Sequence, residues 1–202
     1  LLLQVDRASD AAQRLDAALV AAEADRSRCN ALARELARLC DDRLKDPARA
    51  SAAWDRALRA GPDDREAFER LVALSREGGV KAQRPLLYAL EQVSAETTDA
   101  ALRADMWREQ AAIAEGPLAL PPAAIAALER IRGELPDDAG ALAGLRRLYR
   151  RVQRWGDLAR LLEDVAALPR SPQDDLDPAG CRRELATLCE DELDDLPRAA
   201  RA

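Results

Sequence analysis

The chain has 202 residues, enough for one or two domains with a buried core, and a net charge of −6. Hydrophobic residues make up 48% of the sequence but aromatic residues only 3%, so Ala and Leu must build the core, which favours helix over sheet. The absence of His removes the commonest general base and zinc ligand, and the mixed charges argue against non-specific nucleic-acid binding. We therefore expect no enzyme, no catalytic, cofactor-binding or metal site, and no nucleic-acid partner.

Hydrophobic spacing and helix-start signals predict a series of helices along the whole chain. In chain order they are expected near 9–24, 29–44, 47–60, 64–77, 82–94, 98–115, 122–133, 138–152, 155–168, 178–193 and from 197 onward. Residues 1–6 are expected to be the tail of a preceding helix. Helix starts are marked at 46–47, 62–64 and 136–138, where Pro fits a first turn and Asp caps free N–H groups.

An internal repeat organises these helices. Residues 34–40 (RELARLC) are matched by residues 108–114 (REQAAIA) and again by residues 183–189 (RELATLC). The offsets of about 74 and 75 residues hold four helices, which corresponds to two helical hairpins of roughly 35 to 40 residues each. The sequence therefore predicts a repeat array.

The repeated helices carry a recognisable pattern of small and large residues closed by Pro. One copy is Ala50, Trp54, Ala57 and Pro62, and the other is Ala124, Leu128, Ile131 and Pro136. This pattern resembles the second helix of the tetratricopeptide repeat (TPR) family, and Leu142, Leu145 and Tyr149 resemble that family's first helix. The resemblance implies an all-α, right-handed α-α superhelical solenoid of antiparallel helix hairpins.

The sequence also departs from the family pattern. Arg146 stands where a small residue is usual, Cys40 and Cys189 stand where Tyr is usual, and one extra residue precedes Pro47. A degenerate TPR and a related helical repeat are both compatible with these departures.

We expect one TPR-like array that is a fragment of a longer one, because neither end has a polar capping element. Its expected parts are a partial repeat at 1–26, repeats at 29–61, 62–96, 98–135 and 136–169, and a partial repeat at 178–202.

The four cysteines, Cys29, Cys40, Cys181 and Cys189, include no C-x-x-C pair. They are predicted to be buried, reduced thiols that serve as small apolar side chains. No apolar run reaches the ~20 residues that span a bilayer, so no membrane insertion is expected. A cytoplasmic location follows from these two expectations.

The sharpest functional signal is a set of arginines on predicted first helices, which line the concave groove in the family that the chain resembles. They are Arg34, Arg108, Arg147, Arg150, Arg151 and Arg183. Guanidinium groups suit bidentate contact with carboxylates, so a protein or peptide partner with an acidic or C-terminal segment is a sensible ligand. Gly140, Ala143 and Gly144 are expected to leave room beside them.

Two alternatives stay open at this point. The arginines can instead pair with internal acids, namely Glu35, Glu109, Glu184 and acids on adjacent units. The chain can also be a structural spacer or oligomerisation segment of a larger multidomain protein, with no ligand of its own. Trp54 is expected in the core, whereas Trp107 and Trp155 are the better candidates for partial exposure.

Overall fold

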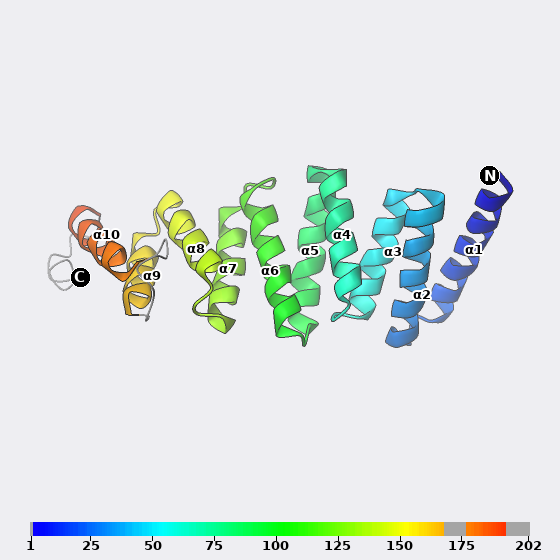
Figure 1. Cartoon of the computed structure of the whole chain (residues 1–202), viewed down its shortest axis with the longest axis horizontal. Coiled ribbons are helices and arrows are strands. Elements are labelled where there is room, and N and C mark those ends of the chain that lie inside the picture. Colours follow the sequence, from blue (N-terminus) through cyan, green and yellow to red (C-terminus); the bar gives the residue numbers. More distant parts are fainter. Residues whose placement is uncertain (1, 168–176, 193–202) are drawn as a thin grey trace. The chain divides into compact units, whose positions relative to one another are not determined.

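The computed structural model describes residues 2–167 and 177–192, which form α-helices and one π-helical turn and contain no strand (Figure 1). The elements are α1 Leu2–Ala21, α2 Arg26–Leu39, η1 Cys40–Leu44, α3 Pro47–Ala60, α4 Arg65–Gly78, α5 Val80–Glu96, α6 Ala100–Glu115, α7 Pro121–Glu134, α8 Ala139–Arg151, α9 Trp155–Ala167 and α10 Pro178–Asp191. The predicted helices of this part are confirmed, with bounds that differ by a few residues except in α1. The helix predicted from 197 onward lies outside the described residues.

The helix starts follow from local capping chemistry. Six of the described helices begin after an aspartate whose carboxylate accepts a hydrogen bond from the backbone N–H three residues on: Asp25, Asp46, Asp64, Asp99, Asp138 and Asp177. This bond satisfies one of the free N–H groups of the first turn. Pro47, Pro121 and Pro178 occupy the first turn of their helices, where a missing N–H costs nothing.

The first hairpin shows how its start and its turn are built, and its start differs from the expectation. The described residues of that segment, 2–6, are not the tail of a separate helix, because α1 continues without a break from Leu2 to Ala21; no Gly or Pro interrupts it. The extra residue before Pro47 is absorbed by the π-helical turn η1, since one inserted residue widens a helical turn. Lys45 then ends the turn in the left-handed conformation, with φ of 52°.

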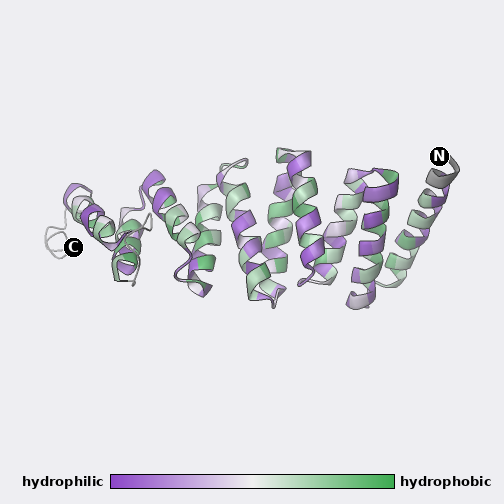
Figure 2. Ribbon diagram, in the orientation of Figure 1, coloured by the Kyte–Doolittle hydropathy of each residue, from purple (hydrophilic) through white to green (hydrophobic). Residues whose placement is uncertain are grey.

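The helices are amphipathic, with hydrophobic and hydrophilic stripes along the same helix (Figure 2).

Small residues let the helices approach closely. A Cβ atom on Gly144 of α8 would lie 2.8 Å from Leu128 Cδ1 of α7, so this glycine is filled by its neighbour rather than leaving room in a groove. The expectation that Gly144 opens space beside the arginines is therefore wrong.

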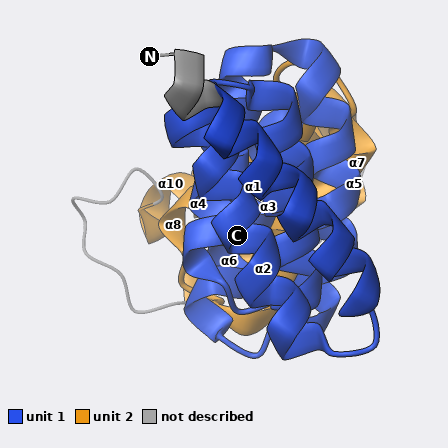
Figure 3. Ribbon diagram, turned by 90° about the vertical axis from the view of Figure 1, so that its right-hand side faces the viewer, with its two compact units in different colours: residues 1–113 blue, residues 114–202 orange. Residues whose placement is uncertain are grey.

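The chain divides into two compact units, residues 1–113 and 114–202 (Figure 3). In unit 1 consecutive helices from α1 to α5 pack against one another, and in unit 2 the same holds from α7 to α10. Each unit is thus a row of helical hairpins. Among the described residues, no helix is long and apolar enough to cross a membrane.

Candidate protein-binding surface

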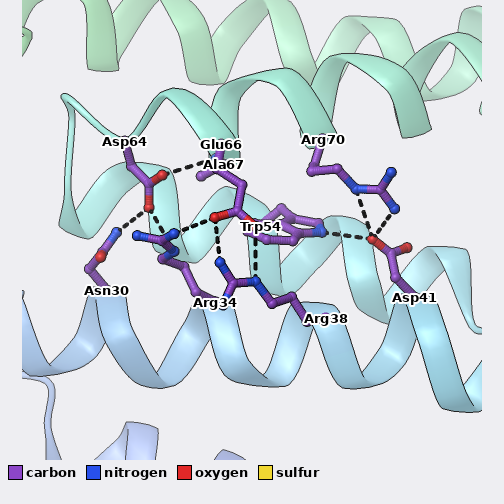
Figure 4. Close-up of polar contacts among 9 residues, drawn as sticks. All are labelled: Asn30, Arg34, Arg38, Asp41, Trp54, Asp64, Glu66, Ala67 and Arg70. Carbon is purple, nitrogen blue, oxygen red and sulfur yellow. Dashed lines mark hydrogen bonds and ion pairs between the residues drawn. The ribbon is translucent and has the colours of Figure 1, made fainter.

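The even-numbered helices of unit 1 are joined by arginine–carboxylate pairs. Glu66, at the start of α4, accepts hydrogen bonds from both Arg34 and Arg38 of α2, with Arg38 Nε at 2.9 Å from Oε1 (Figure 4). The bond from Arg38, followed by the one from Arg34, lowers the pKa of Glu66 below its ordinary value. Asp64 adds a weaker ion pair with Arg34 Nε at 3.5 Å and accepts a bond from Asn30.

A second cluster joins η1, which continues α2, to the neighbouring helices α3 and α4. Asp41 Oδ2 accepts hydrogen bonds from Trp54 Nε1 at 3.0 Å and from Arg70 Nη2 at 2.6 Å (Figure 4). Trp54 is only 1% exposed, so its indole N–H needs this acceptor. The expected core position of Trp54 is confirmed.

An arginine–carboxylate pair also joins α4 to the next even-numbered helix, α6. Arg76 of α4 bonds Glu109 of α6 at 2.6 Å, and the Glu109 side chain is 12% exposed. Arg108 is exposed and lies 2.9 Å from Asp105 of its own helix. Trp107, on the buried side of α6, is 7% exposed. Of the two tryptophans that were the better candidates for partial exposure, Trp107 is buried and Trp155 is half-buried.

In unit 2, four arginines of α8 converge on two carboxylates. Glu115, the last residue of α6, receives Arg147 at 2.6 Å and Arg151 at 3.8 Å. Glu184 of α10 receives both Arg146 and Arg150. The hydrogen bond from Arg147 lowers the pKa of the Glu115 carboxyl below its ordinary value.

Six of the pairs between helices share one sequence spacing, whereas others, such as Arg38–Glu66 at 28 residues and Arg70–Asp41 at 29, do not. The pairs Arg34–Glu66, Arg76–Glu109, Glu115–Arg147 and Arg150–Glu184 join even helices, and Asp16–Arg49 and Arg132–Asp164 join odd helices. All are separated by 32 to 34 residues. Such spacing is that of equivalent helices in successive hairpins, so each unit has a hairpin repeat with two rows of laterally paired helices.

The six predicted arginines fall into both units. Arg34, Arg147, Arg150 and Arg151 pair with acids on a neighbouring even helix, and Arg108 pairs within α6. Arg183 is exposed on α10. Internal pairing, the alternative to ligand binding, is therefore confirmed for the arginines that bond acids on neighbouring helices, including Arg150 with Glu184. Arg34, however, does not pair with the adjacent Glu35 but with Glu66.

Sequence reasoning missed several members of the network: Arg38, Asp41, Glu66, Arg70, Glu115 and Arg146. Opposite charges about 28 to 38 residues apart were the available signal. That signal is weak in a chain where 34% of residues are charged. The four cysteines are buried, as predicted, and burial raises the pKa of the Cys40 thiol.

Within the described ranges, no cluster of three or more His, Cys, Asp or Glu side chains could hold a metal ion. No protein-family model and no curated protein match the sequence significantly. A solved structure described as the MamA RS-1 ArsTM double mutant is 17% identical, covers 88% of this chain and 90% of its own, and superposes with a TM-score of 0.46. A likeness at that score does not define the fold, which rests on the hairpins and their lateral pairs.

Proposed function

We propose that this chain is a protein-interaction scaffold that holds an acidic segment of a partner protein against the arginines of α8. The proposal rests on the shortage of internal carboxylate acceptors for the arginines of α8. Four guanidinium groups share two carboxylates, Glu115 and Glu184, so four positive charges less two negative charges leave an excess of two.

Exposure places that excess where a partner can reach it. The side chains of Arg147 and Arg150 are 61% and 57% exposed, whereas their acceptors Glu115 and Glu184 are 23% and 13% exposed. Each guanidinium has five N–H donors, so one that bonds an internal carboxylate keeps donors for a second. An approaching partner therefore meets guanidinium groups rather than carboxylates.

The finer architecture that we infer is a right-handed superhelical solenoid of TPR-like hairpins, continued as a single array with the repeats given above. The 32-to-34-residue spacing of the six lateral pairs named above and the recurring small–large pattern support it. In such an array the first helices line one groove, which adds Arg34, Arg108 and Arg183 to the binding surface.

A binding role rather than catalysis is supported by a sequence without His. The competing proposal, a spacer or oligomerisation segment without a ligand, predicts no selective binding of an acidic segment. It is favoured by no particular contact in the structure, since internal pairing is compatible with both.

The test uses an oligo-glutamate peptide as probe and an oligo-glutamine peptide of equal length as the neutral comparison. The double variant Arg147→Gln/Arg150→Gln removes two guanidinium groups. It keeps the ion pairs of Arg151 with Glu115 and of Arg146 with Glu184. We expect about tenfold weaker binding of the acidic peptide, because two exposed charge pairs of about 0.7 kcal/mol each contribute together about 1.4 kcal/mol.

The matched control is Arg130→Gln/Arg160→Gln, which removes two exposed arginines from α7 and α9 of the same unit. It should bind like the original chain. Equal loss in both double variants would show that only net charge matters and would refute the α8 surface.

A further inference from the structure

A hollow of about 450 Å³ lies between α7, α8 and α9 of unit 2. Its floor is apolar and is made by Leu142 of α8 and Val165 of α9, both almost wholly buried. Around this floor lie Glu129, Arg132, Gly133, Pro136 and Asp164. Because α10 packs against α9, the hollow lies within the row of hairpins of unit 2.

The internal repeat aligns this hollow with a place in unit 1. At the 74-residue offset of the repeat, Gly133 corresponds to Arg59 and Glu129 corresponds to Asp55. An arginine four residues after an acid in unit 1 is thus replaced in unit 2 by a glycine four residues after an acid.

In unit 1 the arginine occupies this place. Arg59 Nε donates a hydrogen bond to Asp55 Oδ2 of its own helix at 2.8 Å, and Arg59 Nη1 donates to Gln92 Oε1 of α5 at 2.7 Å. The Arg59 side chain is 38% exposed, so much of its length is covered by its neighbours. The arginine therefore bridges two odd-numbered helices and uses a carboxylate as its acceptor.

Gly133 supplies no such side chain. No atom of a neighbouring element lies within 4 Å of a Cβ placed on it, so the hollow extends to the backbone of α7. Phe68 of unit 1 is also replaced, by the smaller Leu142 of unit 2. These two replacements account for the open space.

The carboxylate that corresponds to Asp55 keeps an unused oxygen. Glu129 Oε1 accepts a hydrogen bond from the Tyr149 hydroxyl at 2.7 Å and lies 3.8 Å from Arg154 Nη2. Among the described residues, no donor bonds Glu129 Oε2. Because the Glu129 side chain is 43% exposed, a ligand in the hollow can reach this oxygen.

The charges around the hollow favour a cation. Residues 129–138, which include four of its lining residues, contain four acids and two arginines. One of these arginines, Arg132, already bonds Asp164 of α9. A surface with a negative excess attracts a positively charged side chain rather than a carboxylate.

We propose that this hollow binds an arginine side chain of a partner protein, with its guanidinium on Glu129 and its aliphatic part along Gly133 and Pro136. The partner's arginine takes the place that Arg59 takes in unit 1. A guanidinium suits the site because it bonds a carboxylate through a planar fork while its stem packs on an apolar floor. The site is separate from the α8 arginines, so the proposal goes beyond the proposed function and either can fail without the other.

The test is an NMR titration of the isotopically labelled chain with the peptide acetyl-Gly-Arg-Gly-amide. It should give saturable shifts at Gly133, Leu142 and Val165, with a dissociation constant of about 1–10 mM, because one side chain makes few contacts. The same peptide with citrulline in place of arginine has nearly the same shape without the charge. It should bind at least about threefold more weakly.

Two variants locate the binding site. Glu129→Gln removes the negative charge but keeps an oxygen for the Tyr149 hydroxyl, and it should weaken binding of the arginine peptide at least about threefold. Gly133→Arg supplies the arginine of unit 1 from within the chain and should abolish saturable binding. If Gly133→Arg does not fold, as circular dichroism would show, Glu129→Gln carries the test.

The matched control is Gly156→Arg, which adds the same side chain at another helical glycine with open space around its Cβ. Gly156 precedes Asp164 on α9 by about 12 Å along the helix, so its side chain does not fill the hollow. This variant should bind the arginine peptide normally.

Equal binding of the arginine and citrulline peptides, shifts that avoid the lining residues, or undiminished binding by Glu129→Gln would overturn the proposal. Equal loss of binding in Gly133→Arg and Gly156→Arg would overturn it too, because added charge alone would then explain the loss.

A last variant tests whether the chain supplies the arginine itself. Arg170 follows α9 in the sequence and lies outside the described residues. Arg170→Gln should leave binding of the arginine peptide unchanged. A gain in affinity of about threefold or more would show that Arg170 competes for the hollow and would overturn the assignment to a partner.

Discussion

At the residue scale, Trp54 links packing to the polar network. The side chain is almost wholly buried, and its N–H shares the carboxylate of Asp41 with Arg70. This one side chain of α3 is thus buried and also bonds a carboxylate of η1 that an arginine of α4 shares.

We expect Trp54→Ala to lower the free energy of unfolding by about 3–5 kcal/mol, because it leaves a large cavity. Trp54→Phe keeps most of the packing and should cost only about 1–3 kcal/mol, mainly from the lost bond to Asp41. Urea unfolding followed by circular dichroism measures both. Equal losses for the two variants would show that packing is not the larger contribution.

Glu66 gives a pH-dependent prediction. Its pKa is lowered in the folded chain, chiefly by Arg38, so the ionised form stabilises the fold at pH values above the ordinary pKa of 4.5. This stabilisation is lost as the pH falls through the lowered, folded-state pKa. Because the side chain is 37% exposed, solvent screening limits the effect to roughly 0.5–1 kcal/mol.

Unfolding free energies should be compared at about pH 6 and about pH 3 in the original chain and in Glu66→Gln. The original chain should lose more stability on acidification than the variant does. An identical pH dependence in the two proteins would contradict the stabilising role of the ionised Glu66 carboxylate.

At the element scale, the fit of α8 on α7 depends on Gly144 and Leu128. Gly144→Ala should cost about 1–3 kcal/mol because the new Cβ meets Leu128 Cδ1 at 2.8 Å. In a Leu128→Ala background the same substitution should cost much less, and a double-mutant cycle on unfolding free energies measures this coupling.

Gly133→Ala is the control for that cycle, since nothing lies within 4 Å of a Cβ at this helical position of α7. It should stabilise the chain by about 0.5–1 kcal/mol through the intrinsic helix propensity of Ala. A destabilising Gly133→Ala would mean that the two glycines differ in something other than packing.

The elements were largely predictable because their starts are encoded locally. Asp46-Pro47 and Asp64 mark helix starts that the structure places within one residue of the prediction. The π-helical turn was visible only as one extra residue before Pro47, because whether an inserted residue forms a loop or a widened turn depends on packing.

The arginines of the candidate surface could be identified by repeat position, but their partners could not. Arg34 uses Glu66 rather than the adjacent Glu35, because a side chain on a helix cannot face its immediate neighbour in sequence. Which carboxylate it reaches depends on the lateral packing of helices about 33 residues apart, and this distance in sequence carries no local pattern.

At the scale of the whole molecule, hairpins packed in rows should make stability local. Contacts of a repeat unit fall mostly on its neighbours, so a defect in one unit need not spread through the chain. We expect Trp54→Ala to accelerate amide hydrogen exchange in residues 1–113 and to leave exchange in residues 114–167 unchanged. Uniform acceleration along the chain would show that both units unfold together.

The guanidinium groups of α8 outnumber their internal acceptors, and we propose that they bind an acidic partner segment. The most direct measurement is the salt dependence of oligo-glutamate binding, by isothermal titration, in the original chain, Arg147→Gln/Arg150→Gln and Arg130→Gln/Arg160→Gln. Binding should weaken steeply with salt in the original chain and the control, and weakly in the α8 variant, since exposed charge pairs are screened by ions. The same steep dependence in the α8 variant, at undiminished affinity, would contradict the claim.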